Sequence, residues 1–289
     1  MQQMMIRAID ARWQVRLIVV TATSMVQTVQ RHQRLSPVAT AALGRVMIGA
    51  ALLAGYIKPV RTQRIQIHVH ADGPLQEVMA ECTGDGLVRG YVRNPSVMLP
   101  LRDGKWDVAK AVGRGTMTVI RDFGFGEPYV STVPLVNGEI GADLAHYLFQ
   151  SEQVHSAVLL GVLIRRQRVM AAGGCLVERL PSAREEDMDR LSARIARLGS
   201  ISRWFWHHPE PAALLRALFP DGATEILETR RLRFRCRCNV RRVRAMLRAL
   251  ETRWSFRSES PETTIEVQCR FCRRTYRFPV AEIVAHHRA

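Results

Sequence analysis

Two short stretches near the end of the sequence, Cys236-Arg237-Cys238 and Cys269-Arg270-Phe271-Cys272, decide how the last part of the chain folds. Thirty residues separate the two pairs of cysteines. Four thiolates brought together suit a tetrahedral zinc ion, with zinc–sulfur distances of about 2.3 Å. We therefore predict one zinc ion per chain, bound by Cys236, Cys238, Cys269 and Cys272.

The residues between and after the two pairs have the pattern of a small zinc-bound fold. Asn239 is a good N-cap for a helix. Apolar residues then recur at the spacing that places them on one helix face, and two alternating stretches predict strands. These residues are Val243, Met246, Leu247 and Leu250 in the helix, Ile265 and Val267 before the second pair, and Tyr276 and Phe278 after it. The cysteines therefore belong to a small C-terminal module, which we place at residues 230–289.

This module is strongly basic. The whole chain of 289 residues has 42 Lys and Arg against 26 Asp and Glu, a net charge of +16. From Arg230 onward there are 16 arginines and five glutamates, so the module contributes +11. Arg235, Arg237, Arg270 and Arg273 flank the cysteines, and nearby positive charge favours the thiolate, which is the form that oxidants attack. Since structural zinc supplies much of the stability of so small a domain, oxidation is expected to unfold it.

A helical linker, at residues 181–229, precedes the module. Met188, Leu191, Ile195 and Leu198 are spaced by three, four and three residues, which places them on one stripe of a helix. The cluster Trp204-Phe205-Trp206 follows and is unusually apolar for a connecting segment. Such a surface is either covered by a neighbour or kept for a partner, and the sequence leaves both open.

The first 180 residues predict a mixed α/β domain, so the fold class is α+β. Ser36-Pro37 has the pattern of a cap and first turn that begin a long helix. Helices are predicted at 25–34, 38–57 and 141–149. A single opening strand is predicted through Trp13, Val15 and Leu17, with further strands at 65–70, 75–82, 87–92, 116–121, 129–133, 158–163 and 169–177.

Several classes of function are not supported by the sequence. The longest nearly unbroken apolar run, Val46–Ile57, has 12 residues, whereas a membrane-spanning helix needs about 20, so no membrane partner is predicted. The apolar block Leu17–Val20 is too short for the core of a signal peptide, which makes the cytoplasm the expected location. No motif predicts a catalytic pocket, so we do not expect an enzyme.

Two smaller features outside the module are assigned to structure. Cys82 and Cys175 lie in apolar strand patterns and are predicted to be buried as small hydrophobic residues. His68 and His70 share one face of a strand. That placement is compatible with a metal, but a solvent-facing strand surface explains it more simply.

Four short strings in the first domain, together with the cysteine pattern, resemble the redox-regulated chaperones called 33 kDa chaperonins, or heat shock protein 33. The C-x-C and C-x-x-C pairs fall where that family has its redox cysteines, and the resemblance runs through nearly the whole chain. The four strings are Asp72-Gly73-Pro74-Leu75, Val88-Arg89-Gly90-Tyr91-Val92, Ser151-Glu152-Gln153 and Ala171-Ala172-Gly173-Gly174.

The resemblance implies an ATP-independent holdase. In such proteins the reduced, zinc-bound form is inactive. Oxidation forms a disulfide within each pair, here Cys236–Cys238 and Cys269–Cys272, releases zinc, and unfolds the module together with the linker. The exposed surface then holds unfolding client proteins, usually as a homodimer. The resemblance thus makes Met188, Leu191, Ile195, Leu198, Trp204, Phe205 and Trp206 the candidate client-binding residues.

The chain departs from the family in two ways. Asn239-Val240-Arg241-Arg242 follows the C-x-C pair where relatives have a Ser-Arg-Glu-Arg-like stretch, and the net charge is positive where relatives tend to be acidic. The main alternative is a zinc-ribbon protein whose basic tail binds nucleic acid. Its base-stacking residues would be Trp254, Phe256, Phe271, Tyr276 and Phe278.

Neither competing class fits as well as the holdase. C-x-C is unusual in a zinc ribbon, and a ribbon would leave the first domain without a task. A thiol–disulfide enzyme using Cys269 and Cys272 is a third class, but its motif normally begins a helix in a thioredoxin-like fold.

Overall fold

The computed structural model describes residues 3–220, 223–251 and 263–284. The chain forms two compact units, Met1–Arg235 and Cys236–Ala289. The second unit begins at Cys236, whereas the sequence placed the module from residue 230. The difference arises because β12 (Thr224–Arg231) and β13 (Arg233–Phe234) extend the two sheets of the first unit.

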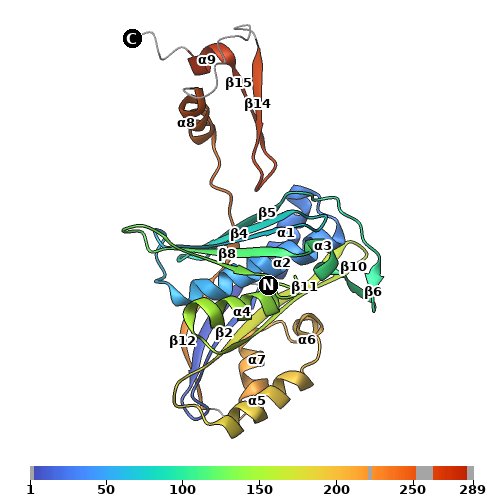
Figure 1. Cartoon of the computed structure of the whole chain (residues 1–289), viewed down its shortest axis with the longest axis vertical. Helices are drawn as coiled ribbons and strands as arrows, with labels where there is room; N and C mark the ends of the chain where they lie inside the picture. The colour runs from blue at the N-terminus through green and yellow to red at the C-terminus, as the bar shows by residue number, and fades with distance from the viewer. Residues whose placement is uncertain (1–2, 221–222, 252–262, 285–289) are drawn as a thin grey trace. The chain divides into compact units, whose positions relative to one another are not determined.

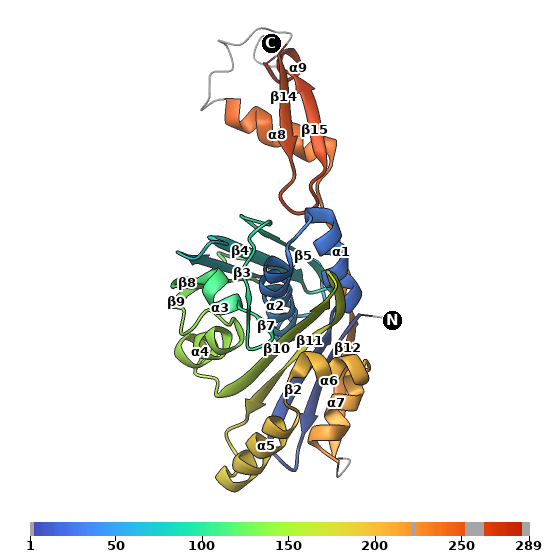
Figure 2. The same cartoon turned by 90° about the vertical axis from the view of Figure 1, so that its right-hand side faces the viewer.

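The first unit is built around α2 (Pro37–Leu53), which lies between two β-sheets (Figures 1 and 2). Ser36 begins this helix as predicted, because its Oγ accepts a hydrogen bond from the N–H of Ala39 at 3.2 Å and Pro37 occupies the first turn. Every residue of α2 except Arg45 is buried. A helix that is apolar on all sides has to be surrounded by other elements, and here the two sheets surround it. The short turn η1 (Ala54–Tyr56) continues it.

The two sheets are antiparallel, apart from the parallel pair β13 and β5. The first sheet has the strand order β10-β11-β2-β1-β12, and the second β13-β5-β4-β3-β8-β9. The strands not yet bounded are β1 (Met4–Asp10), β2 (Val15–Thr21), β3 (Arg64–Ala71), β4 (Glu77–Thr83), β5 (Leu87–Val92), β8 (Gly115–Asp122), β9 (Tyr129–Pro134), β10 (Ser156–Arg165) and β11 (Arg168–Arg179). The smaller elements of this unit are β6 (Leu101–Arg102), β7 (Lys105–Trp106), α1 (Thr23–Gln33), α3 (Val108–Val112) and α4 (Gly141–Glu152).

The linker helices cover the other face of the first sheet. They are α5 (Glu185–Arg197), α6 (Ile201–His207) and α7 (Pro211–Leu218). Their apolar residues share one buried cluster with the outward-facing residues of β1, β2 and β11. The mixed α/β domain with helical linker that the sequence predicts is therefore confirmed.

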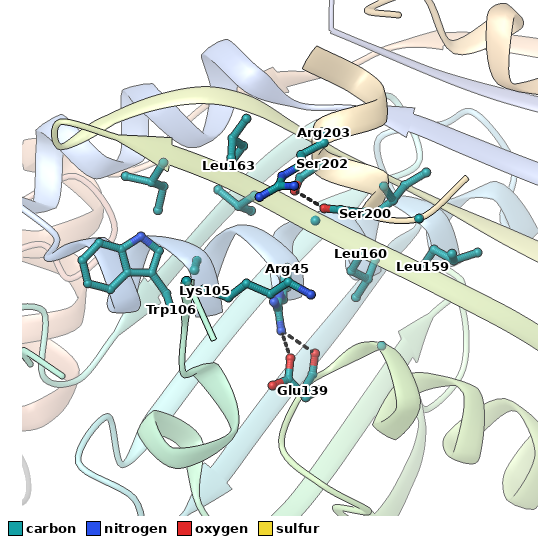
Figure 3. A pocket seen from close by; sticks show the side chains of 18 of the residues that line it. Arg45, Lys105, Trp106, Glu139, Leu159, Leu160, Leu163, Ser200, Ser202 and Arg203 are labelled. Atoms are coloured by element: carbon teal, nitrogen blue, oxygen red, sulfur yellow. Dashed lines mark hydrogen bonds and ion pairs between the residues drawn. The ribbon is translucent and has the colours of Figure 1, made fainter. Parts of the chain in front are cut away.

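A cavity of about 590 Å³ lies where α6 begins to cover β10 (Figure 3). Its lining includes Leu160 and Leu163 of β10, Ser200 and Arg203 at the start of α6, and Arg45, which forms an ion pair with Glu139. The cavity therefore lies among the start of α6, β10 and the Arg45–Glu139 ion pair.

The N-terminal segment corrects one prediction. The sequence predicted a single opening strand through Trp13, whereas the structure has a hairpin of β1 and β2 with Trp13 in its turn. Asp10 Oδ1 accepts hydrogen bonds from the N–H groups of Arg12 and Trp13 at 3.1 and 3.0 Å, which bends the chain. The alternation of apolar and polar residues continues through the turn, because Trp13 is buried there against Phe219, with 5.8 Å between the ring centroids.

The apolar segment around α2 is longer than the sequence analysis allowed. Pro37–Tyr56 spans 20 residues and is long and apolar enough to cross a membrane. The 12-residue apolar run Val46–Ile57 begins directly after Arg45, which is the single charged residue of the longer segment. In the structure 94% of its most apolar window is buried inside the protein, so this helix is the core of the first unit.

The segment (Figure 1, orange) that leads from the linker into β13 is fixed by a buried arginine. Arg230, on β12, is 5% exposed and donates hydrogen bonds to the carbonyl oxygens of Ala54 at 2.8 Å and Ile57 at 3.2 Å. It also donates to Glu228 Oε1 at 2.8 and 2.6 Å. These bonds tie β12 to the end of the central helix.

We expect Arg230→Ala to lower the free energy of unfolding by about 3 kcal/mol, because it removes a buried, fully hydrogen-bonded charge. Urea unfolding of the full chain measures this loss. Arg231→Ala is the matched control, since Arg231 is the next residue on β12 and is exposed; its effect should stay within about 0.5 kcal/mol. Equal losses in the two variants would contradict the anchoring role.

Candidate metal centre

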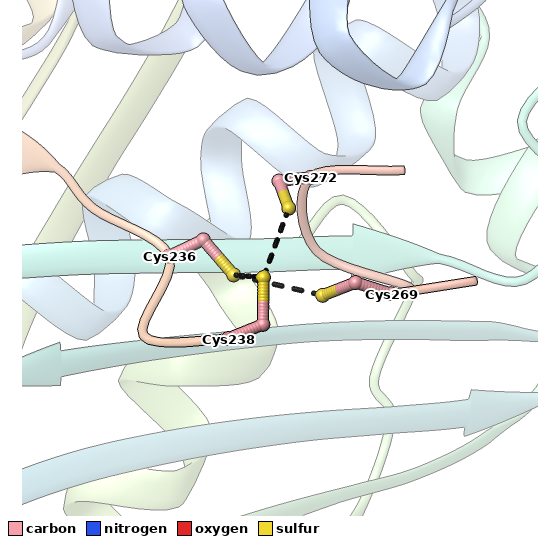
Figure 4. A group of neighbouring side chains, drawn as sticks. All are labelled: Cys236, Cys238, Cys269 and Cys272. Atoms are coloured by element: carbon pink, nitrogen blue, oxygen red, sulfur yellow. Dashed lines mark hydrogen bonds between the residues drawn. The ribbon is translucent and has the colours of Figure 1, made fainter. Parts of the chain in front are cut away.

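The four cysteines come from two loops of the second unit (Figure 4). Cys236 and Cys238 precede α8 (Val240–Glu251), and Cys269 and Cys272 lie between β14 (Thr264–Gln268) and β15 (Thr275–Pro279). The short α9 (Val280–Val284) follows. This order of helix and strands is the one that the sequence predicts for the module.

The four sulfur atoms face one another. Cys236 Sγ lies 3.3 Å from Cys238 Sγ and 3.6 Å from Cys269 Sγ, and Cys238 Sγ lies 3.3 Å from Cys272 Sγ. All four lie within 4.8 Å of one another. In a tetrahedral site with metal–sulfur bonds of about 2.3 Å, neighbouring sulfur atoms are about 3.8 Å apart. The cluster therefore has the composition and the size of a site for one metal ion.

Local hydrogen bonds hold the two loops in shape. Asn239 Oδ1 accepts from the N–H of Arg242 at 2.9 Å, which makes Asn239 the N-cap that the sequence predicts. In the second loop the N–H of Arg273 donates to the carbonyl of Cys269 at 2.8 Å, and the N–H of Cys269 donates to the carbonyl of Arg274 at 2.9 Å. These bonds close a tight turn that points both sulfur atoms inward.

An apolar core lies among the elements that carry the cysteines. Among the described residues it contains the buried Val243, Leu247, Tyr276, Phe278 and Ile283, and Val280 of the same module is also buried. The other two predicted helix positions, Met246 and Leu250, are exposed. In a domain of this size, bonds from the four cysteines to a metal would add to the stability that the apolar core supplies.

Several aromatic residues expected to stack on nucleic acid are not available for that role. Tyr276 is 6% exposed and Phe278 is 2% exposed, because both pack into the core of the module. Trp254 and Phe256 lie outside the described residues. Of the five aromatic residues, Phe271 is thus the one that the described part of the chain leaves partly exposed.

The thiols differ in acidity. Burial raises the pKa of Cys236 far above its ordinary value and raises that of Cys272 to about 11. Burial also acts to raise the pKa of Cys238, but hydrogen bonds from the Tyr276 hydroxyl and from the neighbouring thiols outweigh it, and the pKa falls to about 7. The Tyr276 hydroxyl donates to Cys238 Sγ at 3.1 Å. Without metal, Cys238 therefore ionises far more readily than Cys236 or Cys272.

The other two cysteines are core residues, as predicted. Cys82 in β4 and Cys175 in β11 are completely buried. Burial raises the pKa of each thiol to about 12. They are therefore poor targets for an oxidant.

The candidate client-binding residues of the linker mostly share one cluster. Leu191 and Phe205 are buried in the cluster that the linker helices share with the first sheet. Met188, Ile195, Leu198 and Trp204 are half-buried around them, whereas Trp206 is 39% exposed and lies outside this cluster. In this conformation most of the candidate surface is thus at least half-buried.

The close approach of α6 to the sheet depends on two glycines. A Cβ at Gly173 would lie 2.7 Å from the Phe205 ring, and a Cβ at Gly161 would lie 2.8 Å from Ile201 and Ser202. Real side chains do not approach so closely, so β10 and β11 need glycine where α6 crosses them. This seat is not evident from sequence patterns, although Gly173 belongs to one of the four strings quoted above.

Comparisons with known proteins agree over nearly the whole chain. The sequence profile described as "Hsp33 protein" matches residues 3–279. The 33 kDa chaperonin of Synechococcus sp. strain JA-3-3Ab is 40% identical over 282 residues, covering 96% of this chain and 88% of that protein. A 33 kDa chaperonin of Thermus thermophilus is 41% identical over 295 residues, covering 96% of this chain and 84% of that protein.

A solved structure is also similar. The crystal structure of the 33 kDa chaperonin (heat shock protein 33 homolog) from Thermotoga maritima superposes with a TM-score of 0.88 at 35% identity. The match covers 98% of this chain and 97% of that one. The likeness therefore extends to the fold of both units.

The hydroxyl of Tyr276 generates the prediction for this site. We expect Tyr276→Phe to weaken metal binding about 10- to 100-fold, as loss of a hydrogen bond to a ligand usually does, while the ring keeps its place in the core. Competition with a chromophoric chelator measures the affinity. Arg277→Gln is the control, because Arg277 is the next residue on β15 and pairs with Glu266 on the exposed face. Unchanged affinity in Tyr276→Phe would refute a role for this bond.

Proposed function

The chain belongs to the Hsp33 family of chaperones, and from this premise we propose that it is a redox-regulated, ATP-independent holdase that binds unfolding proteins under oxidative stress. The observation that carries the proposal is the cluster of four sulfur atoms within 4.8 Å, set against the apolar core of a small module. Oxidation of those sulfur atoms would remove the metal ligands on which the module depends.

We propose zinc as the metal, one ion per chain, held by Cys236, Cys238, Cys269 and Cys272. Four thiolates in a closed tetrahedral arrangement are typical of structural zinc. Such an ion would supply no redox chemistry and would keep the thiolates in place. The exposed arginines around the cluster compensate part of the negative charge that four thiolates bring.

The redox step is the proposed conversion of the four thiols to the disulfides Cys236–Cys238 and Cys269–Cys272. With hydrogen peroxide, one thiolate of a pair attacks an oxygen and the O–O bond breaks, which gives a sulfenic acid and hydroxide. The hydroxide takes up the proton that the thiol lost on ionising and becomes water. The second thiol then attacks the sulfenic sulfur, forms the S–S bond and releases a second water. Each pair loses two electrons, and no thiolate remains to bind the metal.

The proximity of residues along the chain supports this pairing. In the folded module Cys238 Sγ is as close to Cys272 Sγ as to Cys236 Sγ. Once the module unfolds, residues that are two or three positions apart stay close, whereas contacts between the two loops are lost. Disulfides within each pair are therefore the ones that can still form once the module has unfolded.

Client binding is proposed for the linker surface formed by Met188, Leu191, Ile195, Leu198, Trp204, Phe205 and Trp206. The partial exposure of this surface in the folded protein supports the proposal. Met188, Ile195, Leu198 and Trp204 are half-buried, and Trp206 is 39% exposed. A homodimer in the active state stays a prediction from the family.

No catalytic role is proposed for the cavity beside α6. Its serines pair with each other, with 3.2 Å between the Oγ atoms of Ser200 and Ser202, and its Glu139 pairs with Arg45. The described residues that line it include no histidine or cysteine. Nucleic acid remains a weaker alternative partner, because two of the aromatic residues that it needs are buried.

The first test compares the zinc-loaded reduced protein with the peroxide-treated protein, both freed of nucleic acid. We expect only the oxidised form to suppress light scattering from a chemically unfolded client after dilution. The Cys82→Ala/Cys175→Ala variant should switch in the same way, because its four module cysteines are intact. Equal suppression by both forms would indicate a constitutive binder. Suppression by neither would favour the nucleic-acid alternative.

A second test releases the linker without an oxidant and without altering any candidate client-binding residue. We expect Gly173→Ala to weaken the packing of α6 by about 1–3 kcal/mol, as overpacking does, because its Cβ would clash with the Phe205 ring as well as with the Val20 carbonyl of the neighbouring strand β2. Reduced Gly173→Ala protein should then suppress light scattering in part. Arg203→Ala, a change in the same helix away from this seat, should leave the reduced protein inactive. An inactive, folded Gly173→Ala protein would refute the assignment of the client surface to the face that α6 covers.

A further inference from the structure

A second group of metal-binding side chains lies on the second sheet. His68 and His70 on β3 share one face of the strand, as residues two positions apart do. His70 is directly opposite Glu77 of β4 in the antiparallel register. The ligand atoms of the three side chains lie within 4.8 Å of one another. The structure thus adds a carboxylate to the two histidines that the sequence assigned to a solvent-facing surface.

The surroundings of these side chains restrict their motion. β3 is paired with β4 on one side and β8 on the other, so its backbone is held on both edges. The Tyr91 hydroxyl, on β5, donates a hydrogen bond to Glu77 Oε1 at 2.5 Å, and His68 Nε2 is 3.2 Å from Gln66 Oε1. The two imidazole rings are stacked, with an interplanar angle of 17° and 6.3 Å between centroids. Hydrogen bonds to the ligands from neighbouring residues are a usual property of metal sites.

The accessibility of the group to solvent also favours binding. His70 is exposed and His68 is half-buried, whereas Glu77 is 9% exposed. A cation could therefore reach the two histidines from solvent, and the Glu77 carboxylate that it would bind is already largely buried.

We propose that His68, His70 and Glu77 form a second metal site, which binds zinc or a similar late first-row divalent cation. Two imidazoles and one carboxylate are a ligand set that zinc accepts, and three protein ligands leave a coordination position open to water. This site belongs to the first unit, and the four cysteines belong to the second.

The chemistry of the two sites differs in one respect that matters under oxidation. The second site has no thiol, so peroxide that converts the four cysteines to disulfides leaves its ligands unchanged. On the proposed function, which this consequence assumes, zinc binding at the cysteines ends on oxidation. Zinc binding at His68, His70 and Glu77 continues.

The test uses the full-length protein after peroxide treatment and removal of metal with a chelator. A calorimetric titration with Zn²⁺ should show one binding site per chain. His70→Gln and Glu77→Gln should weaken binding at least tenfold, and His155→Gln, which changes another exposed histidine, should leave it unaltered. Unchanged binding in His70→Gln, or no binding by the oxidised wild-type protein, would overturn the proposal. Because His70 is exposed, its variant is expected to fold, and circular dichroism checks this.

Cobalt separates this test from that of the proposed function. Co²⁺ bound at the cysteines of the reduced protein should give an intense thiolate-to-metal charge-transfer band. Co²⁺ bound to the oxidised protein should give only weak ligand-field bands, which His70→Gln removes. Loss of the charge-transfer band alone would count against the four-cysteine centre, whereas loss of the ligand-field bands alone would count against the second site.

Discussion

The contact among the four sulfur atoms of the C-terminal module is the interaction on which the proposed function of this protein depends. The four atoms lie within 4.8 Å of one another, and the elements that carry them pack on the apolar core of the module, so on the proposed function a change in the chemical state of the thiols would reach the fold of the module. Cys82 and Cys175, in contrast, are completely buried in the first unit, whose central helix α2 is enclosed by two sheets. The proposal thus separates a part of the chain that an oxidant would alter from a part that it would leave unchanged.

The sequence predicted much of this arrangement because the decisive residues act locally. The cysteine spacing, the Asn239 cap, the alternation of Tyr276 and Phe278, and the Ser36-Pro37 helix start each involve residues a few positions apart. The features that it missed depend on contacts across the fold. β12 pairs with β1 across more than 200 residues, the Tyr276 hydroxyl reaches Cys238 from another strand, and Glu77 joins His68 and His70 only through the register of β3 and β4.

The four strings that carried the family resemblance have physical roles in the first unit. Gly90 lets Leu43 and Met47 of α2 approach β5, and Gly174 lets Ile48 approach β11. Asp72 Oδ1 accepts a hydrogen bond from the N–H of Arg114 at 2.7 Å and fixes a turn. Glu152 pairs with Arg121 at 3.0 Å and accepts from the Tyr147 hydroxyl at 2.7 Å. The strings thus mark the places where the central helix, the sheets and the linker meet most closely.

The anchoring of β12 also determines how far a held client can travel. The linker lies between β11, which ends at Arg179, and β12, which begins at Thr224, and both strands are paired within the first sheet. While those pairings last, residues 180–223 form a loop tethered at both ends, however completely α5, α6 and α7 detach. A loop of this length reaches at most about 75 Å from its anchors, half its extended length. A bound polypeptide would therefore stay within this distance of the first unit. The limit would be the same whether or not the module beyond β13 had unfolded.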